Sequence, residues 1–440
     1  MELRNLTFHG GIHPDYMKEL SNGTEIQVMP APDEVIIPMS QHIGAMAKPL
    51  VKKGDHVLMG QKIAEAQGPV SMNAHSSVSG EVTALIERRG ANGKLEPAIV
   101  IQNDHLDTPG YEKVDRRASE MTVEEMLSYI REAGIVGMGG AGFPTAVKMQ
   151  PPKGMSVDTV ILNGAECEPY LTADDLMMQT TPKRVAEGLG ILMKVTGATK
   201  GYVAIEDNKP KAIAAMEKAI ADVTGAAVAT MKTKYPQGDE KRIVYAITGQ
   251  KVKAGALPAS VGCVVSNVST AAAVSDAVYD GKPLIERVVT VTGHAVKQPM
   301  NVLTRIGTSI HDLVAFTGGY SEQPGKIITG GPMMGVARYD DSVPLDKRNN
   351  GVLVLTQEEA KPQEIQPCIR CGRCVDVCPT HLEPLMIANN ARVDNWEAVS
   401  LFHADHCVEC GSCAYACPSH RPLLEWIRLS KAQLKQMNTK

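Results

Sequence analysis

Aromatic residues and long apolar runs are scarce in this chain of 440 residues. It holds 4 Phe and 2 Trp, and all aromatics together make up 4% of it. The least polar stretch, residues 254–274, is interrupted by Pro258 and several serines, so we predict no membrane-spanning helix. The opening MELRNLTFHGGIHPDY lacks the apolar segment of a signal peptide. We therefore expect a cytoplasmic protein, which only protein partners would hold at a membrane.

A large excess of charge of either sign is also lacking. The formal net charge is −4 at pH 7. This balance argues against a protein that attracts nucleic acid electrostatically, and we predict no nucleic-acid partner. The hydrophobic fraction of 43% is that of an ordinary globular protein. A chain of this length has room for several domains, each with its own core.

Cysteine is nearly absent outside one region. Of ten cysteines, eight lie within residues 368–417, and only Cys167 and Cys263 lie elsewhere. A disulfide framework is typical of small secreted domains and would not be confined to one end of a large chain. The crowding therefore indicates a metal or cluster site.

The eight cysteines form two runs, CIRCGRCVDVCP from Cys368 and CVECGSCAYACP from Cys407. Both follow the spacing C-x2-C-x2-C-x3-C-P of bacterial two-cluster ferredoxins, in which the fourth cysteine of each run ligates the other cluster. Two zinc sites are the alternative, but zinc usually takes separated pairs of ligands. The predicted ligand sets are Cys368, Cys371, Cys374 and Cys417 for cluster 1, and Cys378, Cys407, Cys410 and Cys413 for cluster 2. Between the runs we predict a helical insertion.

A glycine-rich segment, GIVGMGGAGFPTAVK, occupies residues 134–148. A dinucleotide fingerprint would need a strand before the glycines, whereas TVEEMLSYIREAG predicts a helix capped by Thr122; a phosphate loop would end in G-K-[ST]. Exposed backbone N–H groups and Lys148 nevertheless suit an anionic, nucleotide-like ligand. A purely structural turn is nearly as compatible with the pattern.

The order of strand and helix patterns predicts a multidomain α/β protein. Short strands punctuated by glycine resemble the barrel-sandwich hybrid of lipoyl carriers, but the lysine that carriers modify is missing, and His75 is expected at the surface. Strands alternating with helices then predict a Rossmann-like three-layer α/β domain, with Glu166 and Glu168 at a strand end where ligands bind. The predicted domains are a barrel-sandwich hybrid (1–115), the three-layer domain (120–285), a β-grasp domain (286–345) and a helical two-cluster ferredoxin-like domain (356–440).

Over nearly its whole length the chain resembles the RnfC subunit of the Rnf electron-transport complex. The resemblance is carried by the domain order, by GGPMMG at 330–335 and by the cysteine runs. The central segment also resembles the pattern G-x-G-G-A-G-F-P-T-x-x-K of the flavin-binding subunit of respiratory complex I. The resemblance implies FMN, two [4Fe-4S] clusters and NAD(H) as substrate. It further implies a peripheral subunit on the cytoplasmic side of the cell membrane, exchanging electrons between NAD+ and ferredoxin, reached through a partner subunit, with ion translocation.

The same resemblance implies a set of cofactor-binding residues and no catalytic side chain beyond the flavin. Glycines would let the backbone approach FMN, Phe143 would stack on the nicotinamide, and Lys148 would lie near the phosphate. Ala165 stands where the complex I subunit has Asp, and Pro151 stands near its second stacking aromatic. The implied residues are Gly137, Gly139, Gly140, Gly142, Phe143, Lys148, Asn163, Glu166, Glu168, Tyr235, Gly238, Asp239, Glu240, Asn267 and Thr270.

Two other functions stay open on the sequence alone. One is a soluble flavin and iron–sulfur reductase, such as a cobalamin reductase, which would not co-purify with hydrophobic subunits. The other is a non-enzymatic electron relay that has lost its nucleotide site. The intact segments GMGGAGFPT and NGAECEP argue against the relay.

Overall fold

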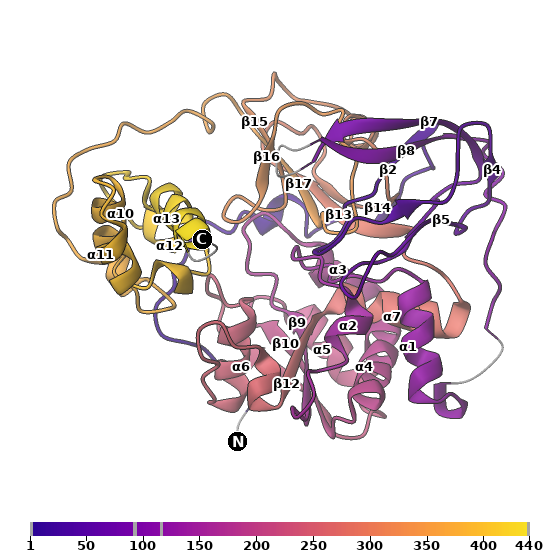
Figure 1. The fold of residues 1–440 in the computed structure, drawn as a ribbon, viewed down its shortest axis with the longest axis horizontal. Helices are drawn as coiled ribbons and strands as arrows, with labels where there is room; N and C mark the ends of the chain where they lie inside the picture. The colour runs from indigo at the N-terminus through magenta and orange to yellow at the C-terminus, as the bar shows by residue number, and fades with distance from the viewer. Residues whose placement is uncertain (1–2, 91–94, 115–117, 438–440) are drawn as a thin grey trace.

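The computed structural model describes residues 3–90, 95–114 and 118–437 (Figure 1). Within these residues the strands form four sheets, and a group of helices drawn in yellow lies at one end of the molecule. This architecture agrees with the predicted multidomain α/β class. The domain limits stay predictions, and those at residues 1, 115 and 440 lie outside the described residues.

The central unit is a parallel sheet with the strand order β11-β10-β9-β12. A parallel sheet needs apolar cover on both faces. Val160 and Leu162 enter the core on one face, whereas Ile161 and Val265 enter a separate core on the other. The strands are β9 (Thr159–Gly164), β10 (Lys200–Glu206), β11 (Ala226–Met231) and β12 (Cys263–Asn267).

Helices cover both faces of this sheet and make it three-layered. On one face lie α4 (Pro182–Thr196), α5 (Pro210–Ala219) and α7 (Val268–Asp280), with α1 (Val123–Glu132) packed against α4 and α7. On the other face lies α6 (Glu240–Thr248). The predicted start of α1 is confirmed, because Thr122 and Glu125 form a reciprocal capping box. Two shorter helices, α2 (Thr145–Lys148) and α3 (Ala173–Thr180), flank the glycine-rich loop and the end of β9.

The barrel-sandwich unit consists of two small sheets. One contains β2 (Glu34–Pro38), β8 (Leu95–Asn103), β7 (Gly80–Arg89) and β4 (His56–Val57); the other contains β3 (Lys48–Pro49), β5 (Lys62–Glu65) and β6 (Ala74–His75). The surface position predicted for His75 is wrong, since the side chain is only 6% exposed. The chain that leaves α1 covers it: a Cβ built on Gly134 would lie 3.1 Å from the His75 ring.

A six-stranded sheet forms the third unit, with α8 (Ile310–Phe316) beside it. Its order is β1 (Gln27–Val28), β14 (Met300–Arg305), β13 (Glu286–Thr292), β17 (Gly351–Leu355), β15 (Lys326–Thr329) and β16 (Val336–Arg338). Strands β1 and β17 thus come from outside residues 286–345. The N-terminal arm also leaves the barrel-sandwich unit, because Leu6 pairs with Met231 and Ile12 pairs with Tyr235.

The iron–sulfur unit is helical and comprises α9 (Arg373–Asp376), α10 (Pro384–Ala391), α11 (Trp396–Leu401), α12 (Ser412–Tyr415) and α13 (Leu423–Met437). The predicted helical insertion is confirmed as α10 and α11, which pack on α13 through Ile387, Val399 and Ile427. A long extended segment joins this unit to the six-stranded sheet (Figure 1). Among the helices of the described residues, none has the length and apolarity needed to cross a membrane.

Candidate functional site

The candidate flavin site lies where the strand order of the parallel sheet reverses. Strand β9 comes first in the sheet's sequence order, and its neighbours are β10 on one side and β12 on the other. Ligands of open α/β sheets bind beyond the carboxyl ends of the strands at such a switch point. There Asn163 and Asn267 are register partners, and Asn267 Nδ2 donates to the Asn163 carbonyl at 3.4 Å.

The glycine-rich loop is fastened against this point. The Met138 N–H donates to Thr270 Oγ1 at 2.9 Å, which ties the loop to the first turn of α7. The loop closes on itself through the Gly142 N–H and the Gly137 carbonyl, 3.1 Å apart. Gly140 has φ +110° and points into open space, a conformation that strongly favours glycine. The loop therefore presents bare backbone, with its exposed tip beside the strand ends.

The residues around the switch point fit a flavin. A Cβ on Gly139 would lie 3.4 Å from the Asn267 side chain, and one on Gly238 would lie 3.2 Å from Cys167 Sγ and 3.5 Å from Asn163 Nδ2. Glycine thus leaves bare backbone next to amide side chains, as a planar polar ring requires. Phe143 lies half-buried at the end of the same loop.

Lys148, expected near the phosphate, forms an ion pair with Glu240 at 2.5 Å. Both side chains are about one-third exposed, 32% and 37%, so the pair borders solvent. Asp239 accepts hydrogen bonds from the N–H groups of Lys241 and Arg242 and so caps α6. These contacts account for the charges of Lys148, Asp239 and Glu240 in the structure; their ligand contacts stay predictions.

The two acids after β9 accept hydrogen bonds from the backbone. Glu166 accepts from the N–H groups of Asp174 and Asp175 at the start of α3, at 2.7 and 3.2 Å. Glu168 accepts from Met333 and Met334 of the GGPMMG turn, at 3.1 and 2.8 Å. Burial raises the pKa of each carboxyl to about 7. Both acids therefore fix neighbouring elements around the site, and their predicted contacts with flavin or NADH stay predictions.

Sequence reasoning missed Lys18, which holds the loop carrying these acids. Its buried ammonium donates to the carbonyls of Glu166, Glu168 and Leu171 at 2.7–3.1 Å. Burial lowers the pKa of Lys18. The residue stands in the N-terminal arm, far from its acceptors in sequence, and no local pattern signals the contact.

Tyr235 connects the α/β unit to the iron–sulfur unit. Its hydroxyl donates to the carbonyl oxygen of Cys410 at 2.8 Å, and its side chain is 1% exposed. Cys167, Tyr235 and Cys410 belong to one small buried cluster with Ile12. Cys167 Sγ also accepts from the Gly238 N–H at 3.2 Å. The ring therefore lies between the loop of Gly238 and a predicted ligand of cluster 2.

The eight clustered cysteines group in space as crossed ligation requires. Burial raises the pKa of Cys413, and the neighbouring Cys410, Cys407 and Cys378 raise it further. Burial raises the pKa of Cys374 as well, where Cys417 and Cys368 add to the effect. The fourth cysteine of each run thus stands beside the other run. Backbone N–H groups of Leu382 and Glu409 point at the sulfurs of Cys378 and Cys407, each at 3.3 Å, as is typical around iron–sulfur clusters.

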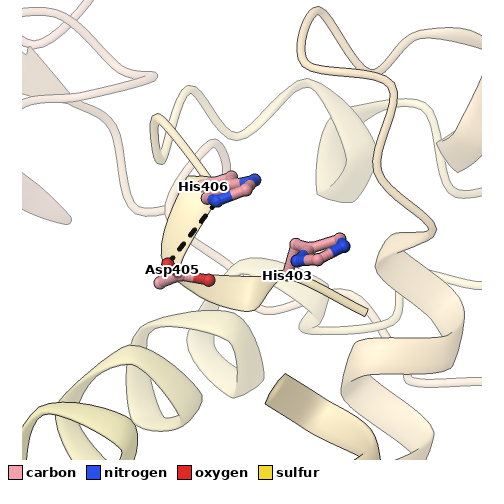
Figure 2. Close-up of side chains that lie close together, drawn as sticks. All are labelled: His403, Asp405 and His406. Atoms are coloured by element: carbon pink, nitrogen blue, oxygen red, sulfur yellow. Dashed lines mark ion pairs between the residues drawn. The ribbon is translucent and has the colours of Figure 1, made fainter. Parts of the chain in front are cut away.

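The spacing of the sulfurs suits a cube better than a zinc ion. Zinc–sulfur bonds of about 2.3 Å bring the sulfurs of a tetrahedral site within about 4 Å of one another. Across residues 3–90, 95–114 and 118–437, the single group of three ligand atoms within 4.8 Å is that of His403, Asp405 and His406, which contains no cysteine. Figure 2 shows these exposed side chains, with the ion pair of Asp405 and His406 at 3.6 Å. The rings of His403 and His406 stack in parallel and do not converge.

The two predicted clusters differ in exposure. Cys378, Cys410 and Cys413 are buried, whereas Cys368 and Cys371 are exposed. The loop around Cys368 also exposes Ile365 and Ile369, at 58% and 68%. Cluster 2 therefore lies inward, against Tyr235, and cluster 1 lies at the surface.

Comparison with sequence families matches all four units. Residues 6–106 match the RnfC barrel sandwich hybrid domain, and residues 130–276 match the Nuo51 FMN-binding domain. Residues 288–337 match the SLBB domain, and residues 367–420 match a 4Fe-4S dicluster domain. The fold class and the predicted FMN and [4Fe-4S] cofactors are thereby confirmed. Fold and site define a flavin- and iron–sulfur-binding electron-transfer protein.

Relatives along the whole chain then give its family. It is 46% identical to the RnfC subunit of the Na(+)-translocating ferredoxin:NAD(+) oxidoreductase complex of Acetobacterium woodii, over 99% of this chain and 98% of that one. It is 49% identical to the equivalent subunit of the proton-translocating complex of Clostridium ljungdahlii, over 87% and 84%. The chain belongs to the RnfC family of subunits of ion-translocating ferredoxin:NAD+ oxidoreductase complexes, as its resemblance to the Rnf protein indicated.

A solved structure shares the fold at low sequence identity. An NAD+-reducing [NiFe]-hydrogenase in the H2-reduced state superposes with a TM-score of 0.52 over 74% of this chain and 68% of that chain, at 17% identity. The likeness supports the architecture alone.

Proposed function

We propose that this chain is the NAD(H)-reactive subunit of a membrane-associated complex that couples electron transfer between ferredoxin and NAD+ to ion translocation. Partner subunits hold it at the cytoplasmic side of the membrane, and one of them exchanges electrons with ferredoxin. The observation that carries the proposal is the contact of Tyr235 with Cys410, which joins the switch-point site to the iron–sulfur unit. The relatives, which are subunits of ferredoxin:NAD(+) oxidoreductase complexes, support it.

The chain's own residues bind and position the cofactor in this proposal. The bare backbone from Gly137 to Gly142 lies against one side of the ring system, and Asn163, Asn267 and Thr270 hold its polar edge. The first turn of α7 and Lys148 favour the phosphate end. When bound, FMN supplies the conversion between hydride and single-electron chemistry that an NAD-linked iron–sulfur protein needs.

The six-stranded sheet contributes a second wall. Glu168 holds the turn at Met333 and Met334 next to the loop after β9. A Cβ on Gly331 would lie 2.3 Å from the Glu168 carboxylate, so glycine is needed for this close approach. The turn and the acid together shield that side of the site from water.

The two predicted clusters then form an inner and an outer position. Cluster 2, with Cys410, lies against Tyr235 and the α/β unit. Cluster 1, with the exposed Cys368 and Cys371, faces solvent beside Ile365 and Ile369. The apolar exposed residues beside cluster 1 suit contact with a partner subunit.

Stopped-flow spectroscopy of the anaerobically purified holoprotein tests the function. Mixing with NADH should bleach the flavin absorbance first and the cluster absorbance afterwards. NADPH at the same concentration provides a matched comparison for the choice of nucleotide. Failure of NADH to bleach a chain shown to contain FMN would contradict the proposal. Full bleaching of flavin without any cluster reduction would contradict the role of Tyr235 and Cys410 as the junction.

The soluble reductase and the electron relay give different results in the same preparation. A relay without a nucleotide site would contain iron and sulfide but a flavin-to-iron ratio near zero. A soluble reductase would carry both cofactors yet would not co-purify with hydrophobic subunits. The family relationship favours a role within the complex over both alternatives.

A further inference from the structure

A cavity of about 360 Å³ lies between the α/β unit and the iron–sulfur unit. Its walls come from the N-terminal arm at Phe8 and His9, from α6 with the loop that follows it, and from the segment 379–381 after Cys378. The glycine-rich loop, Asn163 and Asn267 do not line it, so it is separate from the proposed flavin site. Its volume lies in the range of sites for small molecules.

The lining of this cavity is basic. Lys241, Arg242 and Lys251 contribute three permanent cations, and His9, His381 and His406 add three imidazoles. None of the described residues in the lining is acidic. The closest acids in sequence are already paired, because Asp239 lies 3.6 Å from Arg242 and Asp405 lies 3.6 Å from His406.

The three cations keep donors to spare. Lys241 Nζ donates to the Lys253 carbonyl at 2.7 Å, and Arg242 donates to the Pro379 carbonyl. An ammonium has three donors and a guanidinium has five, so both retain free N–H groups. Lys251 Nζ lies 6.0 Å from the centre of the Tyr245 ring. Cations gathered in a recess are costly unless an anion neutralises them.

Aromatic surface stands beside these charges and spans the junction. The rings of His9 and His381 stack with centroids 5.1 Å apart, one from the N-terminal arm and one from the segment after Cys378. Tyr245 lies on the α6 side. A ligand in the cavity would therefore touch both units at once. The recess is also too small for a protein segment with its own fold, which favours a small molecule.

We propose that this cavity binds a small phosphate-bearing anion that clamps the iron–sulfur unit onto the α/β unit. Lys241, Arg242 and Lys251 neutralise the phosphate groups, and the stacked histidines close one side. Free diphosphate and the diphosphate of a nucleotide share this chemistry. Because Pro379 follows Cys378 and Val408 follows Cys407, the anion would lie within one residue of two predicted cluster 2 ligands.

Isothermal titration calorimetry on the full-length holoprotein, with flavin and clusters in place, tests the proposal. The probes are inorganic pyrophosphate and, separately, ADP. The site variant is the double substitution Lys241→Ala and Lys251→Ala. The matched control is Lys211→Ala with Lys218→Ala, two exposed lysines on α5 that remove the same charge far from the cavity. Filling the flavin site beforehand prevents the probes from binding there.

We expect one binding event in the wild type and in the control, and an affinity lower by about tenfold or more in the site variant. Tighter binding of ADP than of pyrophosphate would identify a nucleotide; equal affinities would identify the diphosphate group alone, and either result supports the site. Absence of binding by both probes, or equal affinities in the two double variants, would overturn it. Iron content and Tm of the variants show whether the junction has stayed folded.

Discussion

The Tyr235 hydroxyl donates to the carbonyl oxygen of Cys410 across the junction of the α/β and iron–sulfur units. The bond is 2.8 Å long and buried, and a parallel contact binds Arg242 to the Pro379 carbonyl. The N-terminal arm adds a third contact, from the Gly11 N–H to the Val377 carbonyl at 2.8 Å. The distance between the flavin site and cluster 2 therefore depends on a few polar contacts with the backbone of the cluster loops.

Substitution Tyr235→Phe should loosen this junction. Removing the donor leaves a buried carbonyl unsatisfied, which costs about 1–3 kcal/mol. We expect unchanged FMN and iron contents, but slower reduction of the clusters after NADH has reduced the flavin. Stopped-flow absorbance measures both phases. Tyr339→Phe, at a side chain 63% exposed, removes the same hydroxyl elsewhere and should leave both phases unchanged. Equal cluster reduction in wild type and Tyr235→Phe would show that the bond is dispensable.

Double substitutions of cysteine test crossed ligation. Cys378 and Cys413 are predicted to ligate the same cluster, so their joint replacement by Ala should remove half of the iron. Cys374 and Cys378 stand in one run but are predicted to ligate different clusters, and their joint replacement should remove nearly all of it. Iron and sulfide analysis with electron paramagnetic resonance of the reduced chain measures both. The opposite pattern would indicate that each run ligates its own cluster.

The sequence predicts features that depend on local spacing. The capping box of Thr122 and Glu125 and the helical insertion between the cysteine runs are confirmed because neighbouring residues determine them. Contacts between distant segments escaped it. Lys18 reaches carbonyls about 150 positions away, and His75 is buried because another unit packs over its strand. A strand pattern tells which residues alternate, not which domain will cover the outer face.

Gly142→Ala should reduce FMN binding. Gly142 has φ +65°, where an L-residue costs about 1–2 kcal/mol. A Cβ there would also lie 2.6 Å from Arg348 Cδ and 3.3 Å from the His42 backbone, so the loop must shift. Gly154→Ala is the matched control, with φ +88° and no atom within 4 Å of the added Cβ. The ratio of FMN to protein after purification measures the effect. Equal FMN contents in the two variants would contradict a role for the loop's position.

Glu168 should make stability depend on pH between its two pKa values. Burial raises the pKa of the folded carboxyl to about 7, whereas an exposed Glu has a pKa of about 4.3. The folded chain then binds more protons than the unfolded chain in this window. The contribution of Glu168 to the free energy of unfolding is therefore present at low pH and is lost as pH rises to 7, by up to about 3 kcal/mol.

Glu168→Gln removes this titration, because an amide keeps the shape of the side chain without ionising. Relative to the variant, wild-type Tm should fall as pH rises from 5 to 7, as differential scanning calorimetry of the holoprotein can measure. Glu124→Gln on the exposed side of α1 should show a constant difference from wild type. A constant difference for Glu168→Gln as well would mean that the carboxylate is ionised throughout this range. Its two backbone donors, Met333 and Met334, would then outweigh the cost of burial.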